Sequence, residues 1–255
     1  MPGSRLRQGF AAAFLCWRAE ALAEAARPGM TPESAPMKFF SFWRSLASFR
    51  VRIALNLKNV PVEVIFVDLD ANAHRDPEYR RINPQMALPA LVEDDGTTLF
   101  QSLAILEYLD EKYPSPPLLP SEPAGRARVR ALALMVACEG HPLLTPRVRR
   151  YLDHELNLRD TQQAAWRRHW IAETLAALEG HLADNKDTEK FCHGDAPTIA
   201  DICMVGHVTA ALNQQVNLTT YPTVKRIFET AMALPEFEKA HPLAQPDTPE
   251  AMRVK

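Results

Sequence analysis

A cluster of prolines divides this chain into two parts whose sequence patterns differ. Five prolines fall within ten residues, at positions 114, 116, 117, 120 and 123. Proline lacks a backbone N–H and interrupts helices and sheets, so no regular element can run through this stretch. In a chain of 255 residues, long enough for two domains, we expect a linker over 118–125 between a first domain at 37–117 and a second at 126–255.

The first domain alternates between strand and helix patterns. The expected elements are strands at 38–43, 62–67, 89–93 and 97–100, and helices at 51–58, 77–82 and 101–113. Asp94-Asp95-Gly96 between the last two strands is a hairpin signal. This order predicts a small mixed sheet covered by helices, an α/β domain.

The second domain shows helical patterns without strand signals. Helices are expected over 126–139 and 162–183, the latter with apolar residues about one turn apart. Thr198 and Asp201 have the spacing of a capping box at the start of another helix. We therefore predict an all-α domain, with a structural rather than catalytic role for this pair.

Residues 1–36 precede both patterns. This segment is too short in its apolar centre for a signal peptide and too acidic for a transit peptide. We interpret it as an accessory extension, partly disordered, with a short helix over 10–26.

The composition favours a cytoplasmic protein that acts on small molecules. Lys plus Arg number 29 and Asp plus Glu 31, so no net field attracts nucleic acid or an anionic membrane. No apolar run approaches the roughly 20 residues that span a bilayer. The four cysteines lack the spacing of a zinc site or a disulfide framework, so we expect no metal and a reducing compartment.

The segment from Phe42 to Leu55 is the expected site of chemistry. It joins an apolar, strand-like run to a helix through hydroxyls and arginines, and Ser48 stands where an N-cap is expected. The free amides and dipole of a helix start favour negative charge. The sequence therefore predicts an anion or thiolate site here, although a hydroxyl before a helix is more often only a cap.

Several segments in a fixed order resemble the glutathione transferase superfamily. They are Asn83-Pro84-Gln85, Leu88-Pro89-Ala90-Leu91, Gln101 to Leu109 and Gly194 to Asp201. The segments Arg50 to Leu55, His141-Pro142-Leu143, Tyr221-Pro222-Thr223 and Gln245 to Pro249 are similar to the zeta class, which includes maleylacetoacetate and maleylpyruvate isomerases. The resemblance covers about residues 37–249. It implies a thioredoxin-like first domain, a helical second domain, glutathione as cofactor and a homodimer.

The resemblance also implies which residues bind glutathione. Ser45 matches the family's catalytic serine and is expected to donate to the glutathione sulfur, with Arg44 beside it; a local turn bond to backbone is the alternative role for its hydroxyl. The other expected glutathione-binding residues are Ser48, Arg50, His74, Leu88, Pro89, Gln101, Ser102 and His141. Gln101 and Ser102 are expected to bind the γ-glutamyl carboxylate, and Leu88-Pro89 matches a cis-proline position. For His141 an interface or structural role is an equal alternative.

The family's isomerases add the thiolate to a cis double bond, allow rotation, and expel the thiolate to leave the trans product. The expected substrate is an anionic α,β-unsaturated diketo acid, with Arg44, Arg147 and Asn213 as candidate binding residues. Asn213 stands where many zeta enzymes have an arginine, Leu46 replaces a serine, and Thr145 replaces an asparagine. These departures leave two alternatives open: a transferase acting on other electrophiles such as α-halo acids, or a weakly catalytic glutathione-binding protein.

Overall fold

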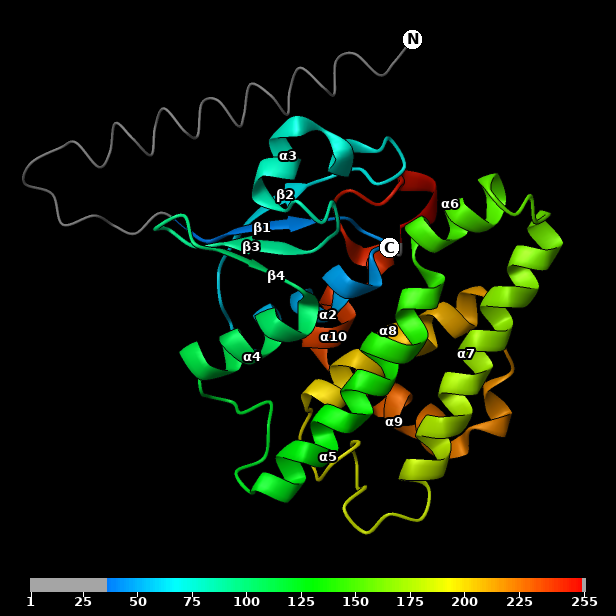
Figure 1. Cartoon of the computed structure of the whole chain (residues 1–255). Helices are drawn as coiled ribbons and strands as arrows, with labels where there is room; N and C mark the ends of the chain where they lie inside the picture. The colour runs from blue at the N-terminus through cyan, green and yellow to red at the C-terminus, as the bar shows by residue number, and fades with distance from the viewer. Residues whose placement is uncertain (1–35, 254–255) are drawn as a thin grey trace, which may run out of the picture.

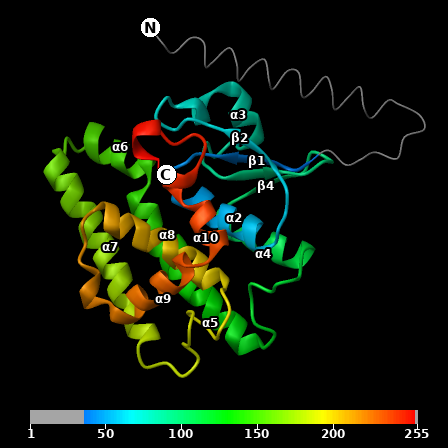
Figure 2. The same cartoon turned by 180° about the vertical axis from the view of Figure 1, so that it is seen from behind.

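The fold is known from a computed structural model, which describes residues 36–253. The expected N-terminal extension and its helix over 10–26 therefore lie outside the described residues, apart from Pro36. The described chain folds into an α/β part with a mixed sheet, followed by a part made of helices (Figures 1 and 2). The fold class predicted from the sequence is confirmed.

The sheet is four-stranded within residues 36–253 and has the order β2-β1-β3-β4. Its strands are β1 (Lys38–Ser41), β2 (Glu63–Phe66), β3 (Ala90–Val92) and β4 (Thr98–Phe100). Strands β1 and β2 pair in parallel, whereas β3 pairs antiparallel with both β1 and β4. The hairpin signal at Asp94-Asp95-Gly96 indeed falls in the β3–β4 turn, where Gly96 has a φ of 86°.

Successive side chains of the strands face two different cores, as the alternation along a strand requires. Phe39 and Leu91 join the large core on the side of α2 (Leu46–Leu57) and α4 (Ser102–Lys112). Phe40 joins the smaller core on the other side, with Tyr79 of α3 (Pro77–Ile82). The sheet is thus covered on both faces, with α3 above it and α2 and α4 below it in Figure 1.

The second part is assembled around one central, buried helix. Its helices are α5 (Pro123–Leu134), α6 (Pro146–His154), α7 (Asp160–Leu182), α8 (Ile199–Asn213), α9 (Pro222–Met232) and α10 (Pro235–Ala240). Short π and 3₁₀ turns, Met135–Gly140 and His141–Leu144, join α5 to α6. Helix α8 is buried along most of its length and packs against α5, α7 and α9. Nowhere in residues 36–253 is a helix both long and apolar enough to cross a membrane.

Helix α2 joins the two parts. It packs against α4 on one side and against α8 and α10 on the other, and Ser48 through Leu55 are all buried. Leu46 in its first turn lies beside Gly206 of α8, since a Cβ built at position 206 would lie 3.9 Å from the Leu46 Cβ. The residue that replaces a serine of the family motif therefore makes an apolar contact with the helical part.

Two helix starts can be compared with their predictions. The capping box is confirmed, because Asp201 accepts hydrogen bonds from the Thr198 amide and hydroxyl, both at 2.8 Å, and from the Cys192 amide at 2.7 Å. The prediction that Ser48 caps the helix after β1 is wrong. The N-cap is Ser45, and the helix begins at Leu46 rather than near Val51, because Leu46 and Ala47 continue the helix into contact with its neighbours.

The burial of His207 in α8 predicts a loss of stability in mild acid. Burial, followed by the charge of Arg50, lowers the pKa of His207 to about 4. As pH falls from 6.5 toward 4, the His207 imidazole binds a proton in the unfolded chain but stays neutral in the folded chain. The free energy of unfolding should fall over this window by about 3 kcal/mol from this residue alone. Denaturant unfolding at a series of pH values should show a shallower slope for His207→Gln than for wild type.

His154 provides the control, because its side chain is largely exposed. The variant His154→Gln should keep the wild-type slope. A His207→Gln protein whose stability falls as steeply as wild type between pH 6.5 and 4 would contradict this assignment.

Candidate active site

Ser45 occupies the start of α2 with its hydroxyl partly accessible. Its backbone is extended, with φ −68° and ψ 113°, and its Oγ accepts a hydrogen bond from the Ser48 amide at 3.2 Å. This local bond uses a lone pair of the hydroxyl and leaves its proton free to be donated. The N-terminal amides and dipole of α2 favour an anion at the same place.

Ser48 and Arg50 lie deeper in the protein than Ser45. The Ser48 hydroxyl is buried and has no hydrogen-bond partner in the described structure. The Arg50 side chain is also buried, and its Nη1 donates to Ser102 Oγ at 3.2 Å. Of the donors expected around the sulfur, Ser48 and Arg50 are thus buried, whereas Ser45 is partly exposed and Arg44 is exposed. Arg50 links α2 to the start of α4.

The backbone of Trp43, two residues before Ser45, is held by hydrogen bonds on both its N–H and its carbonyl. Its N–H donates to Asp247 Oδ2 at 2.8 Å, and its carbonyl accepts from Arg52 Nη2 at 2.9 Å. Arg52 also donates to the Phe42 carbonyl at 3.3 Å and to the Ala240 carbonyl at 2.9 Å. Burial lowers the pKa of Arg52 to about 9, and the charge of Asp247 opposes that shift. These contacts tie the loop that carries Arg44 and Ser45 to the C-terminal tail.

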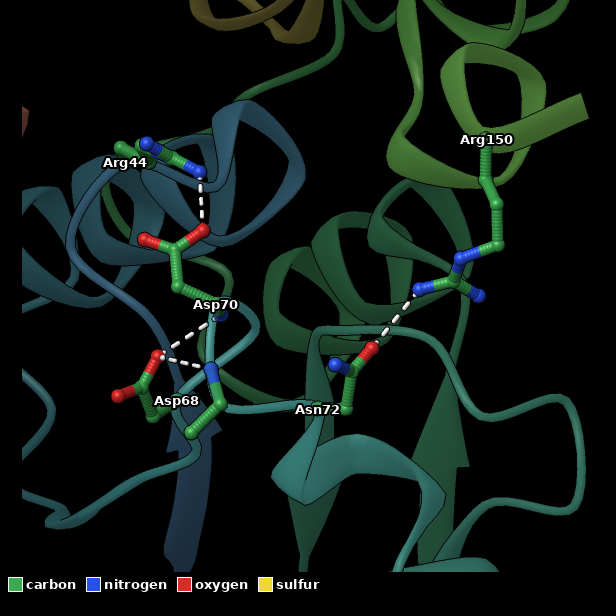
Figure 3. A network of polar contacts seen from close by, with 6 residues as sticks. Arg44, Asp68, Asp70, Asn72 and Arg150 are labelled. Carbon is green, nitrogen blue, oxygen red and sulfur yellow. Dashed lines mark hydrogen bonds and ion pairs between the residues drawn. The ribbon is translucent and has the colours of Figure 1, made fainter. Parts of the chain in front are cut away.

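Arg44 is exposed and forms an ion pair with Asp70 (Figure 3). Its guanidinium also lies 5.8 Å from the centre of the Phe42 ring. Asp68 fixes the Asp70 loop by accepting from the Asp70 and Ala71 amides at 2.8 and 3.1 Å. The cation expected to meet a substrate carboxylate therefore already has a carboxylate partner.

The same loop reaches the helical part. Asn72 Oδ1 accepts from Arg150 Nη2 of α6 at 2.8 Å, as Figure 3 shows. Arg147 of α6 is exposed, and its Nη2 donates to the Gln85 carbonyl at 3.2 Å. Two arginines of α6 are thus anchored to the α/β part, beside the loops that precede β3.

Gln101 and Ser102 form a second polar cluster at the start of α4. Gln101 has φ 68°, an uncommon conformation for a residue other than glycine, of the kind found at binding sites. Its side-chain amide donates to Gln85 Oε1 at 2.9 Å, while Ser102 is buried as the first residue of the helix. The Leu88-Pro89 peptide bond, just before β3, is cis.

His74 lies in the 3₁₀ turn Ala73–Arg75 and is buried, with its Nδ1 lacking a hydrogen-bond partner in the described structure. Burial lowers its pKa, and the charges of Arg75 and Arg147 lower it further. These effects outweigh the opposing charge of Asp76 and favour the neutral imidazole.

Within residues 36–253, the side chains of His141 and Asn213 form no hydrogen bond to the other candidate residues, although His141 lies near enough to Arg50 to be affected by its charge. His141 is partly buried, and burial, followed by the charges of Arg50 and His207, lowers its pKa well below 6.5. Asn213 is exposed at the end of α8, and its side chain forms no hydrogen bond to the other candidate residues in the part of the chain that the structure describes. Thr145 donates to the Pro142 carbonyl at 2.9 Å.

Sequence reasoning missed Asp70, Arg52 and Asp247 as parts of this site. The tail segment that contains Asp247 was recognised only as a family feature, and no local pattern pairs it with Trp43. The arrangement offers a hydroxyl at a helix start, a second helix start with a buried serine, and exposed arginines. Hydroxyls, free helix-start amides and guanidinium groups are all donors, so this arrangement suits an anionic ligand.

Two family models match the chain. The glutathione S-transferase N-terminal domain matches residues 35–111, and the glutathione S-transferase C-terminal domain matches residues 147–235. The chain belongs to the glutathione S-transferase family.

Individual relatives place it near the zeta class. The maleylacetoacetate isomerase of Pseudomonas aeruginosa is 42% identical over 217 residues, which are 84% of this chain and 100% of that protein. A holo maleylpyruvate isomerase, a bacterial zeta-class glutathione transferase, has a TM-score of 0.81 and 40% identity, covering 83% of this chain and 100% of its own. The maleylacetoacetate isomerase of Methylobacterium extorquens AM1, solved with malonate and glutathione, has a TM-score of 0.81 and 46% identity, covering 83% and 99%.

The bracing of Trp43 predicts that Asp247 supports both stability and activity. In Asp247→Ala the buried Trp43 amide loses its acceptor, which should lower the free energy of unfolding by about 1–3 kcal/mol. Asp247→Asn keeps an acceptor but loses the charge near Arg52, so its loss should be smaller. Denaturant unfolding and steady-state kinetics measure both effects.

The exposed Asp184 serves as the matched control. Asp184→Ala should behave as wild type in both measurements. If Asp247→Ala also left the free energy of unfolding and the turnover unchanged, the bracing role of the tail would be refuted.

Proposed function

We propose that this protein is a glutathione-dependent cis–trans isomerase of the maleylacetoacetate or maleylpyruvate type. The observation that carries the proposal is Ser45, whose partly accessible hydroxyl caps α2 and keeps its proton free for a sulfur acceptor. Relatives named as such isomerases align over their whole length at about 40% identity, which supports the same reaction here.

Glutathione is the proposed cofactor. Ser45 would hold its sulfur, Gln101 and Ser102 its γ-glutamyl end, Leu88 and Pro89 its cysteinyl backbone, and His74 its glycyl end. When bound, it supplies a thiolate that adds reversibly to the conjugated double bond of the substrate, so that the bond can rotate before the thiolate leaves.

The chain's own groups make the thiolate available at neutral pH. A free thiol has a pKa of about 8.5 and is mostly protonated at pH 7. The hydroxyl of Ser45 and the amide end of α2 both favour the charged form of sulfur, which lowers that pKa. Ser48 and Arg50, which are also expected to bind glutathione, would contribute from the buried side of α2 rather than by touching the sulfur.

The proposed substrate is a small, anionic α,β-unsaturated diketo acid. Arg44 and Arg147 are the exposed cations for its carboxylates. Because Arg44 pairs with Asp70, a substrate carboxylate has to displace that partner, which favours dianions over weakly charged ligands. Asn213 can contribute a neutral amide only, and His141 is kept neutral by its surroundings.

A second candidate function keeps the thiolate but changes the electrophile. Leu46 removes a hydroxyl beside Ser45, and Asn213 removes a charge expected from the family, so displacement of halide from a small α-halo acid is the alternative reaction. A weakly catalytic glutathione-binding protein is the third. The substrate is a small molecule in each case.

The remaining assignments are also proposals. We propose a homodimer in the cytoplasm that does not bind nucleic acid, a glutathione-binding domain at 37–117, a linker at 118–125, and a helical domain at 126–255 that supplies substrate-side residues. Light scattering of the purified protein tests the dimer, for which a monomer mass would be the contrary result.

Replacing Ser45 should separate the enzymatic proposals from simple binding. Ser45→Ala should lower turnover of maleylpyruvate with glutathione by about ten- to a hundredfold, the scale of one hydrogen bond to a charged group. Ser45→Thr, which keeps a hydroxyl at the cap, should retain most activity. Circular dichroism and glutathione binding by calorimetry would show that both variants are folded.

The controls vary the thiol and the electrophile. Omitting glutathione, or replacing it with S-methylglutathione, should abolish isomerisation, because no thiolate is then present. Turnover that survives either change would refute the mechanism. Halide release from an α-halo acid without isomerisation of maleylpyruvate or maleylacetoacetate would select the second candidate function instead.

A further inference from the structure

Arg50 is a buried cation without a buried anion. Only 2% of the residue is exposed, and Nε lies in the interior with no hydrogen-bond partner among the residues that the structure describes. No carboxylate among residues 36–253 forms an ion pair with it. A charge taken out of water without a counter-charge is costly, so buried arginines are normally paired.

The groups around Arg50 do not compensate its charge. Burial lowers its pKa, and within residues 36–253 the groups that oppose this shift are the thiols of Cys203 and Cys138. Burial raises the pKa of Cys203 to about 11, so this thiol is neutral at pH 7. The nearby His141 and His207 are kept neutral, partly by the charge of Arg50 itself.

Within the described part of the chain, the one side-chain hydrogen bond of Arg50 points to the start of α4. Nη1 donates to Ser102 Oγ at 3.2 Å, so the Ser102 hydroxyl acts as acceptor on that side. Its own proton is then directed elsewhere. Ser102 is the first residue of an eleven-residue helix, whose first amides have no partner within the helix. Three sources of positive potential therefore meet at Ser102: the hydroxyl proton, the helix dipole and the guanidinium.

We propose that Arg50 is a positioning residue for the γ-glutamyl carboxylate of glutathione, acting through the Ser102 hydroxyl and supplying from behind it the positive charge that the carboxylate neutralises. This inference rests on the proposed function and deepens it, because it assigns the counter-ion of the buried arginine to the ligand. Helix α2 then serves two parts of the ligand, with Ser45 at its start for the sulfur and Arg50 further along it for the γ-glutamyl carboxylate.

The test is a coupling measurement between Arg50 and one carboxylate of the ligand. Three S-methylated peptides are used, so that thiolate formation at Ser45 does not contribute. The first is S-methylglutathione. The second is its 4-aminobutanoyl analogue, which lacks only the γ-glutamyl α-carboxylate, and the third is its glutaryl analogue, which lacks only the amino group. Calorimetry gives their affinities for wild type, Arg50→Met, Arg50→Lys and the control Arg80→Met, which removes an exposed charge from α3.

Arg50→Met should weaken S-methylglutathione and the glutaryl analogue by about tenfold or more, the scale of a hydrogen bond to a charged group. It should change the carboxylate-free analogue by less than about threefold. Arg50→Lys should restore part of the lost selectivity, and Arg80→Met should bind all three peptides as wild type does.

Equal weakening of all three peptides by Arg50→Met would show a merely structural role and overturn the inference. So would unchanged binding of S-methylglutathione. If Arg50→Met does not fold, Arg50→Gln, which keeps a donor but removes the charge, decides the matter, because a glutamine variant that binds all three peptides with wild-type affinity would also overturn it. Wild-type protein that binds none of the peptides would instead refute the proposed function, and this inference with it.

Discussion

Helix α2 is buried from Ser48 to Leu55, and this constraint governs the rest of the structure. Helices α4, α8 and α10 pack against it, so the polar side chains in its middle are almost completely removed from solvent. Arg50 and Arg52 therefore depend on partners inside the protein. Arg50 Nη1 donates to Ser102, although its Nε has no hydrogen-bond partner among residues 36–253. Arg52 donates to the carbonyls of Phe42, Trp43 and Ala240. Ser102, Phe42 and Trp43 belong to the segments that carry the candidate site.

This arrangement separates positioning from contact with the ligand. Ser45 and Arg44 remain accessible at the end of α2, while the arginines deeper in the helix fix the segments around them. The C-terminal tail contributes in the same way, because Asp247 holds the Trp43 amide from the opposite side. The precision of the site therefore depends on packing between the α/β part and the helical part, not on the short loop alone.

Local patterns predicted the elements of the fold but not the contacts that join them. Runs of β-prone residues predict the strands, Asp94-Asp95-Gly96 predicts the hairpin, and Thr198 with Asp201 predicts the helix start, because each is decided by neighbours in sequence. The Trp43–Asp247 bond joins residues 204 positions apart, so no periodicity could reveal it. Ser45 and Ser48 both precede the apolar face of the helix, so the local pattern alone favours the wrong cap, Ser48. The packing of Leu46 against α8 extends the helix to Leu46 and makes Ser45 the N-cap.

The central claim is that Ser45 at the start of α2 keeps a bound thiol ionised. Titrating the thiol of enzyme-bound glutathione by the ultraviolet absorbance of its thiolate tests this claim most directly. The account predicts a pKa for wild type clearly below the free value of about 8.5, and a return toward that value in Ser45→Ala. A bound thiol that titrates like free glutathione, or that is indifferent to the loss of the hydroxyl, would contradict it.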